Sequence, residues 1–252
     1  NHWESFKGQG KYYAPLLNIN GKRTQYSKDT YTTDLLTKHA IEWMQTQGDE
    51  QPYFLYLSHK SVHAEFAPAK RHKGYYAGNK ISLPETFEPT KTDAYRSLLW
   101  PEWVKQQRHS WHGVDYMYHQ KRDLHEQVVN YCETLLGVDD SIGAILDYLE
   151  TVGLADDTLV LFTSEQGAQF PGCKWTNWDN GLHTSLVARW PGKIAPARTK
   201  AIVQYADILP TLLDLAGAEA TPEKFDGTSF AAVLYGKHAN HRDYAFGMHH
   251  NF

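Results

Sequence analysis

An apolar run that stops abruptly on polar residues constrains this chain more than any other feature. Residues 158–164 read T-L-V-L-F-T-S, which is typical of a buried strand, and Glu165 and Gln166 follow the run at once, before a glycine. Open α/β sheets keep their ligand sites just past the carboxyl ends of their strands. The loop beyond carries Lys174 among aromatic residues and glycines. The sequence therefore predicts an edge of a sheet where a bound cation faces a bound anion.

Helical and strand patterns alternate on both sides of this run. Apolar residues recur every three or four positions in residues 32–47, 124–153 and 207–215, which predicts three amphipathic helices. Short apolar runs at 52–58, 185–192 and 201–203 predict further strands, the first of them covered on both faces. This alternation predicts an α/β fold in which a layered sheet is flanked by helices.

Glycines and their neighbours refine this expectation at two places. Asn20 and Gly21 lie in a turn-rich stretch and predict a tight hairpin. Gly137 and Gly143 interrupt the apolar stripe of residues 124–153. Each costs roughly 1 kcal/mol relative to alanine inside a helix, so we expect that helix to pack closely on a sheet there.

Composition limits the kinds of partner that the chain can have. Its 252 residues are enough for one substantial core, and 41% of them are hydrophobic and 21% charged, as in an ordinary globular protein. The net charge of −4 leaves no basic footprint for nucleic acid, and no stretch approaches the ~20 apolar residues of a membrane span. The two cysteines, Cys132 and Cys173, fall in different patterns, and we expect free thiols.

Four residues carry the chemistry that the sequence allows. Glu165 and Gln166 offer hard oxygen ligands of the kind that Ca²⁺ or Mg²⁺ binds, but Ca²⁺ takes ~6–8 ligands, and a solvated loop carboxylate is the alternative. Lys174 can neutralise an anionic oxygen or lie exposed. His63 can act as a general acid, because the unperturbed pKa of histidine, ~6.5, is near working pH. With 14 histidines in the chain, most are structural or exposed.

Other residues have weaker claims on the same grounds. Tryptophans in the long stretch from 68 to 113 can stack on sugar rings or pack in a core. The remaining candidates for anion or substrate binding are His59, Lys60, His183, His249 and His250. The chain contains no C-x-x-C pair, G-x-S-x-G elbow, glycine-rich phosphate loop or H-E-x-x-H helix.

Taken together, five segments resemble the sulfatases of the alkaline-phosphatase superfamily. The matching segments are P-Y-F-L-Y-L-S-H-K-S-V-H-A-E-F (52–66), V-D-D-S-I-G-A-I-L-D-Y-L-E-T-V-G-L-A-D-D-T-L-V-L-F-T-S-E-Q-G (138–167), G-C-K-W (172–175), V-A-R-W-P-G-K (187–193) and A-D-I-L-P-T-L-L-D-L-A-G (206–217). They cover nearly the whole chain in the order of the family. The resemblance implies an alkaline-phosphatase-like sheet flanked by helices, incomplete in this chain.

The resemblance also implies an activity and roles for particular residues. It implies a sulfuric-ester hydrolase that acts on a sulfated carbohydrate, with a formylglycine nucleophile beside one Ca²⁺ ion. His63 resembles the histidine that protonates the leaving oxygen, and Lys174 resembles the lysine that grips the sulfate. Glu165 and Gln166 stand where the family usually has Asp followed by Asn or His, and each is one methylene longer. The residues expected to contact substrate are Lys60, His183 and His249.

One expected motif is not found in the sequence. Neither C-x-P-S-R nor S-x-P-x-R, the signals from which formylglycine is made, occurs in these residues. We therefore expect the nucleophile and the remaining metal ligands upstream of Asn1, in which case the chain is a C-terminal fragment that is inactive alone. Residues 1–227 would then belong to the α/β catalytic domain, and residues 228–252 would begin a small α+β C-terminal subdomain.

Two alternative functions stay open at the level of sequence. A phosphatase or phosphonate hydrolase of the same superfamily, and a non-catalytic carbohydrate-binding relative, are the alternative functions. The resemblance implies a periplasmic, secreted or lysosomal location. The oligomeric state, the sugar and the position of its sulfate are not predicted.

Overall fold

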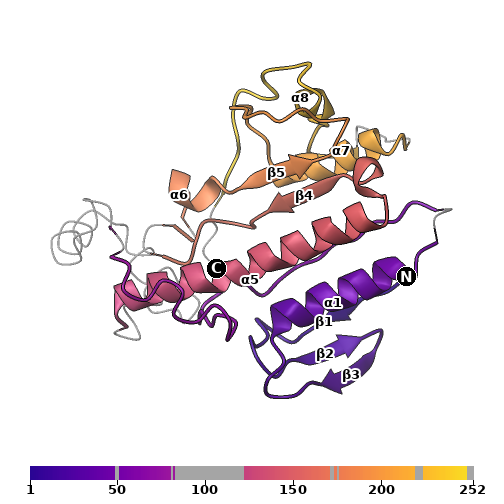
Figure 1. Cartoon of the computed structure of the whole chain (residues 1–252). Coiled ribbons are helices and arrows are strands. Elements are labelled where there is room, and N and C mark those ends of the chain that lie inside the picture. Colours follow the sequence, from indigo (N-terminus) through magenta and orange to yellow (C-terminus); the bar gives the residue numbers. More distant parts are fainter. Residues whose placement is uncertain are drawn as a thin grey trace. The chain divides into compact units, whose positions relative to one another are not determined.

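The computed structural model describes residues 1–48, 51–80, 82, 122–170, 173–174, 176–218 and 224–248 (Figure 1). The chain divides into two compact units. The first comprises Asn1–Tyr148 together with Gln169–Lys174, and the second comprises Leu149–Ala168 together with Trp175–Phe252.

The first unit begins with a three-stranded antiparallel sheet. Strands β1 (Glu4–Ser5), β2 (Leu16–Ile19) and β3 (Lys22–Gln25) pair in that order. Asn20 and Gly21 connect β2 to β3 with φ angles of 49° and 93°, the left-handed conformations that a two-residue hairpin of type I′ requires. The hairpin predicted at these two residues is confirmed.

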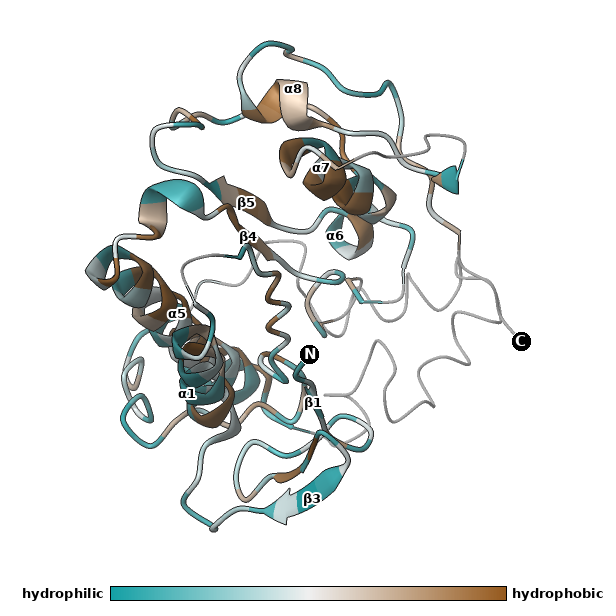
Figure 2. Ribbon diagram, turned by 90° about the vertical axis from the view of Figure 1, so that its right-hand side faces the viewer, coloured by the Kyte–Doolittle hydropathy of each residue, from teal (hydrophilic) through white to brown (hydrophobic). Residues whose placement is uncertain are grey.

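Helix α1 (Thr32–Gln45) covers this sheet and confirms the helix predicted from residues 32–47. Its apolar stripe brings Leu35 and Leu36 against Leu17 of β2, and Leu17 has no exposed surface. By contrast, β3 is hydrophilic along its whole length (Figure 2). The core of this region therefore lies between α1 and the central strand.

Helix α5 (Leu124–Thr151) is the longest of the described helices and confirms the one predicted from residues 124–153. It runs beside α1 (Figure 1), and the Thr37 hydroxyl of α1 donates a hydrogen bond of 2.6 Å to the Ser141 hydroxyl of α5. Cys132 of this helix and Cys173 are not joined by a disulfide.

The glycines of α5 do not pack on a sheet as expected. A Cβ atom added to Gly137 would lie 3.3 Å from the ring of Tyr31, so this glycine accommodates a tyrosine. At Gly143 an added Cβ would meet nothing within 4 Å. The prediction was wrong because a glycine inside a helix shows only that a side chain is missing, not what approaches it.

The apolar run at 52–58 does not form the strand that its composition predicts. Residues 52–58 have no regular secondary structure, and alternate side chains are exposed; Phe54 and Tyr56 are 71% and 81% exposed, whereas Leu57 packs against the cluster around Leu17. The expectation that both faces would be covered is therefore wrong. A strand needs a neighbour for its backbone groups, and the described part of the chain places no strand beside this run. The strand predicted at 201–203 is likewise not formed.

The second unit is built around an antiparallel pair of strands. A 3₁₀ turn, η1 (Ala155–Asp157), leads into β4 (Val160–Thr163), which pairs with β5 (Leu186–Arg189) so that Val160 lies opposite Arg189. Both strands were predicted from the apolar runs around residues 158–164 and 185–192, and both are confirmed.

Short helices complete the second unit. The turn η2 (Tyr205–Asp207) continues into α7 (Ile208–Leu215), as predicted for residues 207–215, and hydrophobic residues dominate α7 (Figure 2). Two single-turn helices, α6 (Asp179–Leu182) and α8 (Ala231–Leu234), lie in the connecting segments.

The buried carboxylate of Asp207 connects residues 228–242 to the start of α7. Asp207 has no exposed surface, and its carboxylate accepts hydrogen bonds from the main-chain amides of Gln204 (2.7 Å) and Thr228 (3.0 Å). The Arg242 guanidinium donates to the same carboxylate, and the His241 Nε2 atom lies 3.3 Å from it. A buried charge needs such partners, so these contacts fix how residues 228–242 return to α7.

The fold is therefore mixed α/β, as predicted, but its sheets are small. In the described residues, one three-stranded and one two-stranded antiparallel sheet take the place of the expected single layered sheet. Of the helices that the structure describes, none combines the length and the apolar character that crossing a bilayer requires.

Candidate active site

Two residues predicted to be catalytic meet in the first unit. The Lys174 Nζ atom lies 3.3 Å from the His63 Nε2 atom, and Lys174 is only 6% exposed. His63 follows the extended run at 52–58, and Lys174 lies on the Gln169–Lys174 segment that belongs to the same unit. The structure thus brings together a histidine and a buried ammonium group from distant parts of the sequence.

Hydrogen bonds fix which nitrogen of His63 faces Lys174. The His63 Nδ1 atom lies 2.5 Å from the carbonyl oxygen of Ala64. A carbonyl oxygen can only accept, so Nδ1 carries the proton and the Nε2 atom of the neutral ring is an acceptor. The Lys174 ammonium group donates to this acceptor. Any further proton that His63 binds must go to Nε2, the atom that faces Lys174.

Lys60, a predicted substrate-binding residue, lies in the same segment. Its Nζ atom lies 4.5 Å from the centre of the Tyr12 ring, and its carbonyl oxygen accepts a 2.9 Å hydrogen bond from the main-chain amide of His63. Burial lowers the pKa of Lys60 to about 8, although Glu65 acts in the opposite direction. The structure therefore places a partly desolvated ammonium group three residues before His63.

His59 has a structural environment. Its Nε2 atom lies 3.0 Å from the Ser141 hydroxyl of α5, which in turn accepts from Thr37 of α1. Burial lowers the pKa of His59 to about 4. A histidine held neutral between two helices anchors the segment rather than binding an anion.

The two predicted metal ligands lie in the second unit, directly after β4. The Gln166 amide nitrogen donates a 2.9 Å hydrogen bond to one oxygen of the Glu165 carboxylate. Behind them, the Gly167 amide donates to the carbonyl of Gly181, and a Cβ atom added to Gly167 would fall 1.9 Å from the carbonyl oxygen of Asn180. Only glycine fits at this position, so the turn that presents Glu165 and Gln166 is fixed by close backbone contact.

This pair has the right chemistry for a hard cation but too few donors. The pair provides two side chains with oxygen donors, whereas Ca²⁺ takes ~6–8 oxygen ligands. In the part of the chain that the structure describes, no group of three or more His, Cys, Asp or Glu residues is placed to hold a metal ion. The described residues therefore supply at most part of a metal site.

The remaining predicted residues lie in the second unit or outside the described residues. His183 ends α6 in the second unit, where it is exposed and its Nδ1 atom lies 3.7 Å from the Asp179 carboxylate. His249 and His250 lie outside the described residues, as do the tryptophans of the stretch from 68 to 113. Within the first unit, the structure thus places Lys174 beside His63 and Lys60 in the same segment as His63.

Sequence reasoning missed two residues that hold His63 in place. The Tyr12 hydroxyl donates a 2.6 Å hydrogen bond to the carbonyl of His63, and the Gln169 side-chain oxygen accepts a 3.2 Å hydrogen bond from the amide of Ala64. Both side chains are buried. Neither belongs to a helical or strand pattern, and no motif marks them, so the sequence offered no signal for this role.

Comparison with known proteins identifies the family of this chain. The family model described as Sulfatase matches residues 3–218, which is most of the chain. The chain therefore belongs to the sulfatase family, within the alkaline-phosphatase superfamily.

Individual relatives agree with this assignment. The chain is 27% identical over 292 aligned residues to N-acetylglucosamine-6-O-sulfatase of Bacteroides thetaiotaomicron, covering 93% of this chain and 51% of the relative. It is 25% identical over 245 residues to N-acetylglucosamine-6-sulfatase of Bos taurus, covering 94% and 42%. The chain thus spans about half the length of these relatives.

A solved structure shows the same fold. It is that of a protein in complex with its substrate D-glucosamine-2-N,6-O-disulfate, and it superimposes with a TM-score of 0.74 at 24% sequence identity. The match covers 97% of this chain and 60% of that one. At this level of identity the likeness concerns the fold.

Proposed function

We propose that this chain forms part of a sulfatase that hydrolyses the sulfate ester of a sulfated carbohydrate. The observation that carries the proposal is the 3.3 Å approach of Lys174 Nζ to His63 Nε2 in a member of the sulfatase family. Residues 1–227 would belong to its catalytic domain, and residues 228–252 would begin a C-terminal subdomain.

His63 would protonate the leaving oxygen. The alkoxide of a sugar is a poor leaving group, so its departure requires a proton in the transition state, and a positioned histidine can supply one. Because Nδ1 is hydrogen-bonded to the Ala64 carbonyl, His63 would gain and release the catalytic proton at Nε2. This geometry dedicates one ring nitrogen to the substrate and the other to holding the ring.

Lys174 would stabilise the negative charge that develops when the ester bond breaks. Its ammonium group lies beside the nitrogen that delivers the proton, so both can reach one leaving oxygen. Lys174 is almost fully buried. A charge that is shielded from water acts more strongly on its neighbours, and it is already oriented before the reaction begins.

A metal ion would complete the active site, together with a nucleophile from outside the described residues. Glu165 and Gln166 would provide two oxygen ligands to a divalent cation, which is Ca²⁺ according to the family resemblance. When bound, the cation would neutralise sulfate charge and formylglycine would supply the attacking oxygen. We place the formylglycine and the other ligands before Asn1, because the sequence contains no maturation motif.

The substrate that we propose to test first is a 6-O-sulfated glucosamine. Two relatives with this activity in their names, from Bacteroides thetaiotaomicron and Bos taurus, support the choice. Lys60 lies in the segment that carries His63 and would contact an anionic group of the sugar. His183 and His249 would contact the substrate from the remainder of the chain.

The test is a hydrolysis assay on the full-length protein that includes the residues before Asn1. We expect release of sulfate from N-acetylglucosamine-6-sulfate and little release of phosphate from N-acetylglucosamine-6-phosphate. Faster release of phosphate would instead identify a phosphatase of the same superfamily. Binding of the sulfated sugar without turnover of either ester would identify a carbohydrate-binding relative and overturn the proposal.

A further inference from the structure

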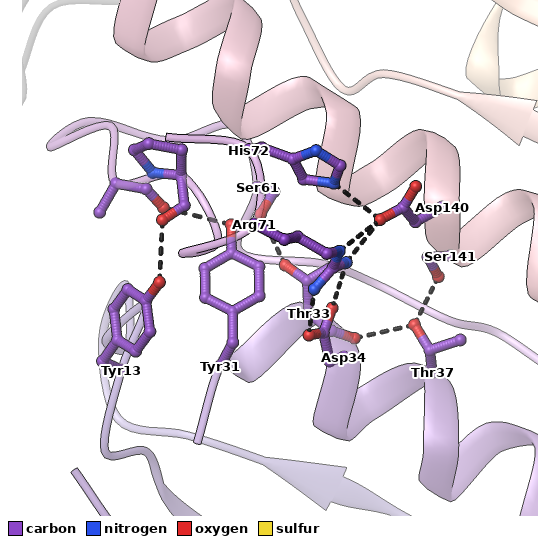
Figure 3. Close-up of polar contacts among 12 residues, drawn as sticks. Tyr13, Tyr31, Thr33, Asp34, Thr37, Ser61, Arg71, His72, Asp140 and Ser141 are labelled. Atoms are coloured by element: carbon purple, nitrogen blue, oxygen red, sulfur yellow. Dashed lines mark hydrogen bonds and ion pairs between the residues drawn. The ribbon is translucent and has the colours of Figure 1, made fainter. Parts of the chain in front are cut away.

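Three neighbouring tyrosines hold the segment that follows His63. Their hydroxyl groups donate to three main-chain carbonyls of this segment: Tyr12 to His63 (2.6 Å), Tyr31 to Ala67 (3.2 Å) and Tyr13 to Pro68 (2.9 Å). The last two contacts are seen in Figure 3, where the tyrosine rings stand side by side beneath the segment. The rings also contact each other, with 6.2 Å between the centres of Tyr12 and Tyr31 and 5.1 Å between those of Tyr13 and Tyr31.

Tyr12 differs from the other two tyrosines because it contacts two predicted site residues. Its hydroxyl bonds to His63, and the Lys60 ammonium group lies over the face of its ring. The Tyr12 side chain is buried, and burial raises the pKa of its hydroxyl well above the usual range. The hydroxyl is therefore protonated, and a donor, at neutral pH.

Gln169 holds the other end of the same peptide unit. The carbonyl of His63 and the amide of Ala64 belong to one rigid, planar group. Tyr12 donates to its oxygen, and Gln169 accepts from its nitrogen. The next carbonyl, that of Ala64, accepts a hydrogen bond from the Nδ1–H group of His63. Fixing this peptide plane therefore fixes the direction in which the His63 ring points.

We propose that Tyr12 is a positioning residue for His63, and that Gln169 is its counterpart on the opposite side of the His63–Ala64 peptide unit. This inference rests on the proposed function, in which His63 protonates the leaving oxygen. Proton transfer is sensitive to geometry, and displacement of a reacting group by about 1 Å can lower a rate ~100-fold. Tyr12 acts on the reaction only through the orientation of His63.

The kinetic test compares two substrates in the full-length protein. The variant Tyr12→Phe keeps the ring, its stacking and its contact with Lys60, and removes only the hydroxyl. We expect it to lower kcat at least ~10-fold on a sugar sulfate, because a loosely held His63 delivers its proton less often to the productive position. KM should stay within about twofold, because the loss of a proton donor acts on the transition state. On 4-nitrophenyl sulfate, whose leaving group departs without a proton, kcat should stay within about twofold.

The control variant is Tyr13→Phe. It removes the same kind of hydrogen bond from the adjacent tyrosine, but from the Pro68 carbonyl instead of the His63 carbonyl. It should change kcat on neither substrate by more than about twofold. Equal losses on both substrates in Tyr12→Phe, or equal effects of Tyr12→Phe and Tyr13→Phe, would show a general structural role and overturn the proposal.

A second measurement tests the positioning role of Tyr12 and Gln169 without an activity assay. In protein labelled with ¹⁵N-histidine, the His63 resonances should report a proton on Nδ1, and Tyr12→Phe should increase the fraction carrying it on Nε2. Gln169→Met, which removes the acceptor from the Ala64 amide, should have the same effect, and it serves if Tyr12→Phe does not fold. His63 resonances unchanged in the folded variants would overturn the inference. An altered His63 in a protein that hydrolyses no sulfate ester would uphold the positioning role and refute the proposed function instead.

Discussion

The side-chain nitrogens of Lys174 and His63 lie 3.3 Å apart, although 111 positions separate the two residues in the sequence. Neutral His63 accepts a hydrogen bond from the lysine. A protonated His63 would repel it, unless an anion lay between them. The pair is therefore arranged to receive a negatively charged group.

Replacement of His63 by alanine should affect turnover much more than folding. We expect kcat on a sugar sulfate to fall ~10²–10⁴-fold, because the variant lacks the proton donor. The free energy of unfolding, measured in denaturant, should change by less than about 1 kcal/mol, because the His63 side chain is only partly buried. Kinetics equal to those of the wild type would remove His63 from the mechanism.

Replacement of Lys174 by methionine keeps the apolar stem and removes the charge. The variant should lose ~10²–10³-fold in kcat, the effect expected when one group that stabilises transition-state charge is deleted. Its KM should also rise, because the sulfate of the bound ester loses its ionic partner. The matched control is Lys193→Met on an exposed loop, which should leave both constants unchanged. If the two lysine variants behave alike, Lys174 has no role in the site.

His59 should make the protein sensitive to acid. Its pKa is about 4 when folded and 6.5 in an unfolded chain, so the unfolded state binds more protons between these values. The free energy of unfolding should therefore fall as the pH falls from 6.5 to 4, by about 3 kcal/mol in total from this group. His59→Gln should remove that part of the loss, whereas His125→Gln, at an exposed position of α5, should not. Denaturant unfolding measures the stability at each pH. If both variants and the wild type show the same dependence on pH, His59 is not the group that makes the protein sensitive to acid.

An ion-pair network joins α1, α5 and the segment around Arg71 (Figure 3). Arg71 donates two hydrogen bonds to Asp34 (2.6 and 2.9 Å) and one to Asp140 (2.7 Å), to which His72 also bonds (2.7 Å). Partial burial alone would raise the pKa of Asp140, but the hydrogen bonds from His72 and Arg71 outweigh it and hold that pKa below its ordinary value.

Asp140→Asn should therefore destabilise the protein, but only slightly. The network is half exposed, and we expect a loss of about 1 kcal/mol at low salt that becomes smaller in 1 M salt. The control is Asp139→Asn, its exposed neighbour on α5, which should have no effect larger than about 0.3 kcal/mol. Thermal unfolding at two salt concentrations measures both. A loss that does not depend on salt would show that Asp140 acts through packing and not through charge.

The proposed metal ligands can be tested by direct binding. After chelation, the full-length protein should bind Ca²⁺ in a calorimetric titration, and Glu165→Ala should weaken the affinity at least tenfold through the loss of a carboxylate ligand. The control is Asp157→Asn, which changes an exposed carboxylate at the opposite end of β4. If Glu165→Ala binds Ca²⁺ as tightly as this control, Glu165 is not a ligand.

Helices were predictable from this sequence, whereas most of the strand pairing was not. The pattern of α1, α5 and α7 repeats every three or four residues, so each helix can be recognised from its own segment. A strand depends on a partner that is distant in sequence, and the apolar composition of residues 52–58 could not show whether a partner lies beside them.

The candidate site, like the fold, could be predicted only in part. Resemblance to a family identified His63 and Lys174, and the structure brought them together. The side chains that fix His63 come from positions 51 residues before it and about a hundred after it, and no local pattern marks Tyr12 or Gln169. Contacts of this kind exist only once the chain has folded.

The buried carboxylate of Asp207 also has a practical consequence for anyone who shortens or labels this protein. Its side-chain partners include Arg242, which lies 35 positions further along the sequence, and the neighbouring His241. Removing one member of a buried ion pair typically costs ~3–5 kcal/mol, a large part of the stability of a domain. Trimming back past Arg242, or fusing a bulky tag at that point, would therefore risk unfolding α7 and the strands beside it.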